Sequence, residues 1–134
     1  YLSVNPAQKS LTWVRAGHDP AMLYNPGTDT IEELRGKGIA LGVYGGSEYR
    51  GQIIKGFSDG QVLLIGTDGL WETRNESGEM FGKERLEALI RRYANLSSKQ
   101  MITSIIDALQ AFRKSVKQDD DITLVVIKVD KLGL

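Results

Sequence analysis

The pattern of apolar residues changes once along this chain, near Asp68, and that change limits the folds open to it. Before Asp68 the sequence consists of short β-prone runs separated by turn residues, which is typical of a sheet. The predicted strands cover residues 1–5, 10–15, 21–24, 30–34, 48–57 and 61–67. We expect 21–24 and 30–34 to form one hairpin, and 48–57 and 61–67 to form a second one through Ser58-Asp59-Gly60.

The segment after Asp68 has helical periodicity. One or two helical turns are predicted over 69–75, and apolar residues recur at helical spacing over 83–93. Ser97 and Gln100 have the spacing of a capping box, before a helix that runs to about Ser115. A β-branched run over 122–129 then predicts a last strand. Strands followed by helices and a closing strand predict one α+β domain over residues 1–134.

The composition argues against several classes of function. Lysine plus arginine equals aspartate plus glutamate, 17 of each, so no net charge favours nucleic acid or an anionic membrane. No apolar run approaches the roughly 20 residues of a membrane span. The chain has no cysteine, which removes disulfides, thiolate metal ligands and cysteine nucleophiles together. With no signal peptide in view we expect a cytoplasmic protein.

Acidic residues stand at the ends of two predicted strands. Asp68 follows the strand 61–67, and Asp119, Asp120 and Asp121 precede the last strand. If these strands are neighbours, the carboxylates meet at one edge of a sheet, where like charges raise each other's pKa unless a cation neutralises them. Carboxylate ligands without cysteine favour Mg²⁺, Mn²⁺ or Ca²⁺ over zinc. Taken singly, Thr67-Asp68-Gly69 is more often a turn than a metal ligand, and a run such as Asp119 to Asp121 is more often a solvated loop.

Five ordered motifs resemble the bacterial PPM-type (protein phosphatase 2C-like) serine/threonine phosphatases, in the sporulation stage II protein E and sigma-factor-regulator branch. They lie in residues 15–24 (Arg15-Ala16-Gly17-His18-Asp19-Pro20 at its start), 41–42 (Leu-Gly), 59–69 (ending in Thr67-Asp68-Gly69), 72–82 and 120–126 (starting with Asp120-Asp121-Ile122-Thr123). Their order and spacing hold over residues 16–126. The resemblance implies an α+β fold in which two antiparallel sheets pack as a sandwich flanked by helices, with a two-metal centre at one end.

The resemblance also assigns roles to individual residues. Asp68 and Asp120 match the family's metal-binding aspartates, in a centre that holds two Mn²⁺ or Mg²⁺ ions when complete. Gly69 and Asp121 are expected beside these ligands, Asp121 standing where many relatives have asparagine. Glu72 either orients a metal-bound water or is a plain surface residue of a helix.

Two further features carry open alternatives. His18 is the only histidine, and we expect it to hydrogen-bond the loop between two strands, because the family's proposed acid histidine belongs to a motif that this chain lacks. Residues 35–47 hold five glycines, which predicts a mobile, irregular segment. That segment is either a flap beside the site or only a flexible loop. Asp119 matches no motif residue and is expected in solvent.

The resemblance implies a metal-dependent phosphatase that acts on phosphoserine or phosphothreonine of a regulatory protein, such as an anti-anti-sigma-type regulator, with a metal-activated water and no protein nucleophile. The start at Tyr1, without the family's first metal motif, indicates the C-terminal part of the domain. We expect that part to be nearly inactive alone and able to form a homodimer through an unpaired sheet edge. The alternatives are a regulatory pseudophosphatase without turnover and, more weakly, a structural sandwich with a calcium site.

Overall fold

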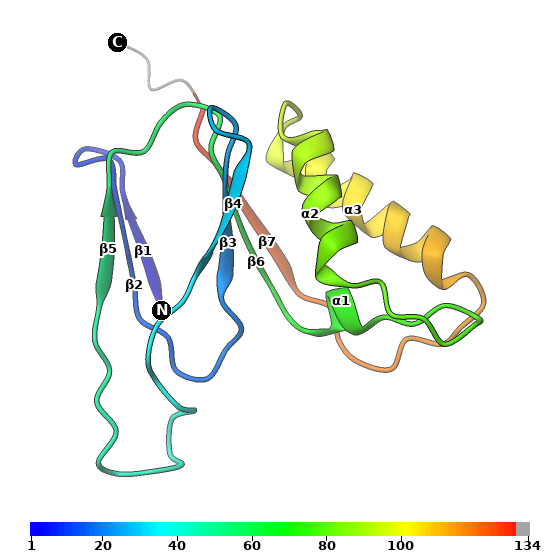
Figure 1. Ribbon diagram of the computed structural model, residues 1–134, viewed down its shortest axis with the longest axis horizontal. Helices are drawn as coiled ribbons and strands as arrows, with labels where there is room; N and C mark the ends of the chain where they lie inside the picture. Colours follow the sequence, from blue (N-terminus) through cyan, green and yellow to red (C-terminus); the bar gives the residue numbers. More distant parts are fainter. Residues whose placement is uncertain (131–134) are drawn as a thin grey trace.

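The computed structural model describes residues 1–130, which form two sheets and a helical layer (Figure 1). The strands are β1 (Leu2–Asn5), β2 (Ser10–Trp13), β3 (Ala21–Asn25), β4 (Thr30–Leu34), β5 (Gln52–Lys55), β6 (Val62–Gly66) and β7 (Leu124–Lys128). The helices are α1 (Gly69–Glu72), α2 (Lys83–Tyr93) and α3 (Ser98–Arg113). None of the helices in the described part of the chain combines the length and apolarity needed to cross a bilayer.

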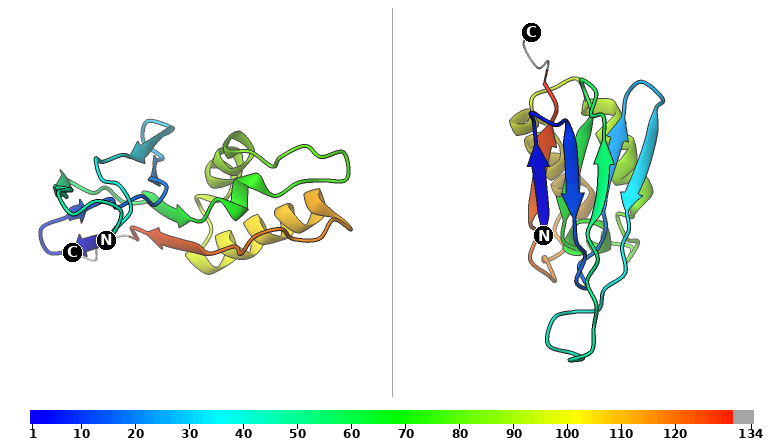
Figure 2. Two further views of the ribbon diagram at one scale, coloured as in Figure 1. Left: turned by 90° about the horizontal axis from the view of Figure 1, so that it is seen from below. Right: turned by 90° about the vertical axis from the view of Figure 1, so that its left-hand side faces the viewer.

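The two sheets are antiparallel throughout. The first sheet has the order β1-β2-β5, and the second has the order β4-β3-β6-β7. Helices α2 and α3 cover the face of the second sheet that points away from the first (Figures 1 and 2). The predicted α+β sandwich of two antiparallel sheets with flanking helices is therefore confirmed.

The predicted hairpin of 48–57 with 61–67 is wrong. β5 pairs with β2 in the first sheet, whereas β6 lies between β3 and β7 in the second. β6 is buried on both faces and so takes an interior position, while β5 exposes 54% of Ile53 and lies at a sheet edge. Gly60, with a φ of +81°, belongs to the connection that carries the chain from one sheet to the other.

The remaining predicted elements are confirmed. β3 and β4 form the first predicted hairpin, and α2 has the predicted bounds. α3 has the capping box: the Ser97 side chain accepts from the Gln100 N–H at 3.3 Å, and the Gln100 side chain accepts from the Ser97 N–H at 3.1 Å. α3 ends at Arg113 rather than Ser115. Residues 35–47 contain no strand or helix, as predicted, and their mobility stays a prediction. The strand predicted over 48–57 is shorter in the structure, where β5 covers only Gln52–Lys55.

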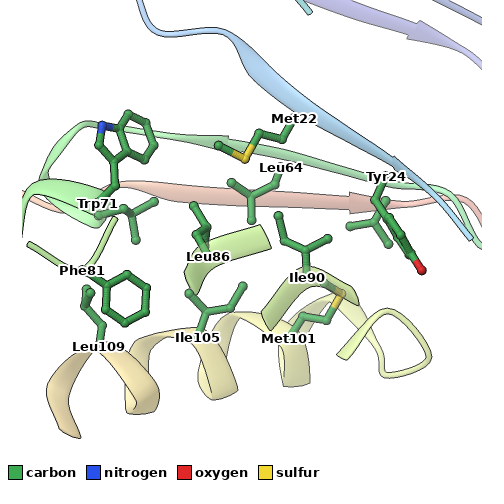
Figure 3. Close-up of a cluster of buried hydrophobic side chains, with 12 residues drawn as sticks. Met22, Tyr24, Leu64, Trp71, Phe81, Leu86, Ile90, Met101, Ile105 and Leu109 are labelled. Carbon is green, nitrogen blue, oxygen red and sulfur yellow. The ribbon is translucent and has the colours of Figure 1, made fainter. Parts of the chain in front are cut away.

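Two apolar cores hold the layers together. The larger core lies between the second sheet and the helices (Figure 3) and contains Met22, Tyr24, Val62, Leu64, Leu70, Trp71, Phe81, Leu86, Ile90, Met101, Ile105 and Leu109. The smaller core lies between the sheets and contains Leu11, Trp13, Leu23, Leu34 and Leu63. Successive residues of β6 serve opposite cores, because side chains alternate along a strand. β6 is thus packed on both faces, which fixes the position from which the chain continues to Asp68.

Candidate metal centre

The end of β6 and the start of β7 form one edge of the second sheet. Gly66 pairs with Leu124, so the residues that follow Gly66 lie beside those that precede Leu124. The Thr67 hydroxyl donates to the Asp121 carbonyl at 3.0 Å and accepts from the Thr123 N–H at 3.0 Å. Residues 54 positions apart are thereby tied together, and the predicted pairing of 61–67 with 122–129 is confirmed.

Gly69 allows the two strand ends to approach closely. A Cβ on this buried residue would lie 2.7 Å from the Asp121 carbonyl oxygen, closer than real Cβ atoms come. The side chain of Asp68 is exposed and makes no capping hydrogen bond to α1, although Asp68 is the N-cap residue. The Asp68 carboxylate is therefore not used to cap α1. The buried Leu70 and Trp71 anchor this helix in the larger core.

Asp68 borders an open hollow of about 290 Å³, which we call the Asp68 hollow. Its lining residues are Gly17, His18, Asp19, Gly66, Thr67 and Asp68. The exposed His18 ring places Nδ1 2.8 Å from the Asp19 carbonyl oxygen, and Arg15 Nε donates to the His18 carbonyl. Both contacts lie within the loop between β2 and β3, as expected of a histidine that orders this loop.

Asp120 borders a different hollow of about 110 Å³, which we call the Asp120 hollow. It is lined by Gly69, Glu72, Thr73, Arg74, Met80, Arg113, Lys117, Gln118, Asp119 and Asp120. The Asp120 carboxylate accepts from the Asp121 N–H at 2.7 Å, and the Asp120 carbonyl accepts from Gln118 Nε2 at 2.8 Å. Glu72 and Asp120 thus share one hollow, and Asp68 lies in the other.

The donor chemistry fits a hard divalent ion, but the described chain does not group a full ligand set. Asp68, Glu72 and Asp120 are exposed carboxylates at one edge, and such oxygens are the preferred ligands of Mg²⁺ and Mn²⁺. Within residues 1–130, no three acidic or histidine side chains are gathered as a metal ion requires. The chain thus offers part of a site, and the assignment of Asp68 and Asp120 as ligands stays a prediction, as do the supporting roles of Gly69, Asp121 and His18.

Two loops beside the Asp120 hollow are tied to each other. Arg74 and Met80 form a bridge that closes a small hairpin, and Glu76 lies at its tip. Glu76 accepts a hydrogen bond from the Ser115 hydroxyl at 2.6 Å and lies 3.6 Å from the Lys114 ammonium. The Ser115 hydrogen bond first, and the Lys114 charge second, lower the pKa of the Glu76 carboxyl below its usual value.

Sequence reasoning missed four residues that line these hollows. Asp19 adds a second carboxylate to the Asp68 hollow. Arg74, Arg113 and Lys117 line the Asp120 hollow, where Asp119 also lies, exposed to solvent as predicted. Arg74 lies far from Arg113 and Lys117 in the sequence, so no sequence pattern marks the three basic residues as a group.

Solved structures share this fold. The SiaA-PP2C domain of Pseudomonas aeruginosa matches with a TM-score of 0.79 and 22% identity, over 92% of this chain and 48% of that one. The phosphatase domain of SpoIIE from Bacillus subtilis, presoaked with Mn, matches with a TM-score of 0.69 and 14% identity, over 100% of this chain and 57% of that one. The fold is therefore that of the PP2C-type phosphatase domains.

The family follows from the sequence comparison. The model of "Stage II sporulation protein E (SpoIIE)" matches residues 1–130, so the chain belongs to this family and the predicted resemblance is confirmed. Phosphoserine phosphatase RsbU of Bacillus subtilis (strain 168) is 28% identical over 128 residues, which cover 96% of this chain. The chain spans 37% of the length of RsbU.

Proposed function

We propose that the protein containing this chain is a cytoplasmic, metal-dependent serine/threonine phosphatase that acts on a phosphorylated regulatory protein in partner-switching signalling. The observation that carries the proposal is the pairing of β6 with β7, which brings the segments of Asp68 and Asp120 to one sheet edge. A relative named as a phosphoserine phosphatase and a structural neighbour presoaked with Mn support it.

Each residue at this sheet edge has its own role in the proposal. Asp68 and Asp120 would hold Mn²⁺ or Mg²⁺, with two ions in the complete site. When bound, such ions lower the pKa of water and offset charge on phosphoryl oxygens. Thr67 and Gly69 keep the Asp121 carbonyl close to α1, through the hydroxyl contact and the absent Cβ. Glu72 lines the Asp120 hollow, where its carboxylate would orient a water.

The glycine-rich segment has a place in this proposal as a flap for the substrate. The Gly17 N–H donates to the Gly38 carbonyl at 3.2 Å, so the base of the segment adjoins the loop that lines the Asp68 hollow. Leu41, Val43 and Tyr44 are 74%, 71% and 69% exposed. Large apolar side chains exposed together on one loop are typical of a contact surface for another molecule.

The decisive experiment replaces the candidate ligands in the full-length protein. We expect Asp68→Asn and Asp120→Asn each to lower phosphate release by roughly 100-fold or more at saturating Mn²⁺, because each removes a charged metal ligand. The fold should persist, since removing one charge from a repulsive acidic group relieves strain. Asp107→Asn, an exposed change on α3, is the control. Full activity of either variant at low metal would remove that residue from the site.

The second candidate is a regulatory module that binds a protein without turnover. Residues 1–130 by themselves offer only part of a ligand set, so this second candidate is tested beside the first. Phosphate release by the full-length protein, measured with Mn²⁺, Mg²⁺ and a chelator, separates the two. Metal-dependent release supports the phosphatase, and binding of a phosphorylated regulator without any release supports the regulatory module.

A further inference from the structure

Three cations converge on the Asp120 hollow from two parts of the chain. Arg74 comes from the hairpin after α1, Arg113 from the last turn of α3, and Lys117 from the loop that follows α3. The proposed phosphatase chemistry uses none of these residues. Three basic side chains beside a candidate metal site need their own explanation, because cations near the metal oppose metal binding.

The three cations form no ion pair with the acidic residues that line the same hollow. Glu72, Asp119 and Asp120 line the same hollow, yet none lies within 4.0 Å of a charged nitrogen of Arg74, Arg113 or Lys117. Among residues 1–130, the side chains of these cations donate hydrogen bonds only to neutral oxygens. Arg74 donates to the Gly78 carbonyl at 2.7 Å and Arg113 to Gln118 Oε1 at 3.5 Å.

The walls of the hollow are joined before any ligand arrives. The Glu76 contacts with Ser115 and Lys114 link the hairpin that carries Arg74 to the segment that carries Lys117. The cations are thus held on two connected loops rather than on independent ones, which lowers the entropy cost of binding an anion between them. A volume of about 110 Å³ suits a single small anionic group with some water.

We propose that the Asp120 hollow is an anion subsite that holds the acidic side chain flanking the phosphorylated residue of a protein substrate. The inference rests on the proposed phosphatase function, and it names the substrate class. Guanidinium and ammonium groups recognise carboxylates through charge-assisted hydrogen bonds. Because Glu72 and Asp120 share the hollow with the cations, the flanking acid would bind directly beside the phosphoryl group that the metal edge receives.

The test uses the full-length protein and two phosphoserine peptides that differ only in an aspartate or an asparagine next to the phosphoserine. We expect kcat/KM to favour the aspartate peptide by about three- to tenfold, since each partly exposed ion pair contributes modestly. In the double variant Arg74→Gln, Lys117→Gln the preference should fall to about one. Lys99→Gln, at the other end of α3, is the matched control and should keep the preference. The single variant Lys117→Gln disturbs no hydrogen bond or ion pair among residues 1–130. It therefore tests the same preference, which should fall, if the double variant does not fold.

Each result decides between alternatives. Equal kcat/KM for both peptides in the unmodified protein, or a preference that survives in both variants, would overturn the subsite. Peptide binding measured by fluorescence anisotropy gives a readout without turnover, and a preference in binding alone would keep the subsite while removing the proposed phosphatase. Inhibition by inorganic phosphate that weakens in the double variant, without any peptide preference, would assign the hollow to released phosphate and overturn the flanking-acid inference.

Discussion

The two cores of this domain differ in size and in what they support. Twelve buried residues form the core between the second sheet and the helices, and five form the core between the sheets. α1, which directly follows Asp68, belongs to the larger core. The first sheet instead adjoins the long loop that exposes Leu41, Val43 and Tyr44. The larger core therefore anchors the helix that follows Asp68, while the loop beside the first sheet presents exposed apolar surface.

Matched truncations of one apolar side chain in each region give the largest expected difference. We expect Leu86→Ala, which empties a fully buried position in the larger core, to lower the free energy of unfolding by about 2–5 kcal/mol. Ile53→Ala, on the exposed face of the first sheet, should change it by no more than about 0.5 kcal/mol. Urea unfolding of both variants measures the difference. Equal losses would show that the two regions contribute alike.

Two glycine substitutions sharpen the comparison at the level of the backbone. Gly69→Ala places a Cβ against the Asp121 carbonyl, so the two strand ends must separate. We expect this variant to lower the free energy of unfolding by about 1–3 kcal/mol and also to reduce the rate of phosphate release. Gly45→Ala, in the exposed loop with no atom within 4 Å of the new Cβ, should change stability by less than about 1 kcal/mol. Unfolding and activity measurements on both variants test this. Wild-type activity of Gly69→Ala would mean that the close approach is dispensable.

The smallest expected effect concerns the loops on the helical side, and it depends on pH. The pKa of Glu76 is lowered in the folded state from its ordinary value of 4.5, mainly by the Ser115 hydrogen bond. Its contribution to stability is therefore present above about pH 4.5 and is lost as the pH falls through the lower folded pKa. Glu76→Gln should lose stability relative to the unmodified protein at pH 7 and approach it in acid.

The matched control for that effect is Glu32→Gln, which changes an exposed carboxylate of β4 that has no side-chain partner among the described residues. Unfolding midpoints at pH 7 and near pH 3.5 give the comparison. A stability difference between Glu76→Gln and the unmodified protein that stays constant between the two pH values would contradict the role of the Ser115 contact.

Sequence reasoning succeeded where the pattern is local or where ordered motifs carried it. The periodicity of α2, the capping box of α3 and the approach of β6 to β7 were all predicted. The hairpin of β5 with β6 was not, because a glycine turn permits a hairpin but burial on both faces decides which strands are interior. The basic lining of the Asp120 hollow was invisible, since Arg74 and Lys117 meet only after the helices have packed.

The contact between Thr67 and Asp121 also determines the order in which parts of the fold can form during translation. The ribosome delivers β6 first, and both long helices must follow before β7 appears, because the partners of this contact are 54 residues apart. Local helix formation is fast, whereas closing such a long loop is slow. During translation, β6 and the Asp68 that follows it are therefore synthesised well before β7, the strand that pairs with β6. The sheet edge that carries Asp68 is therefore complete only after β7 has docked against β6.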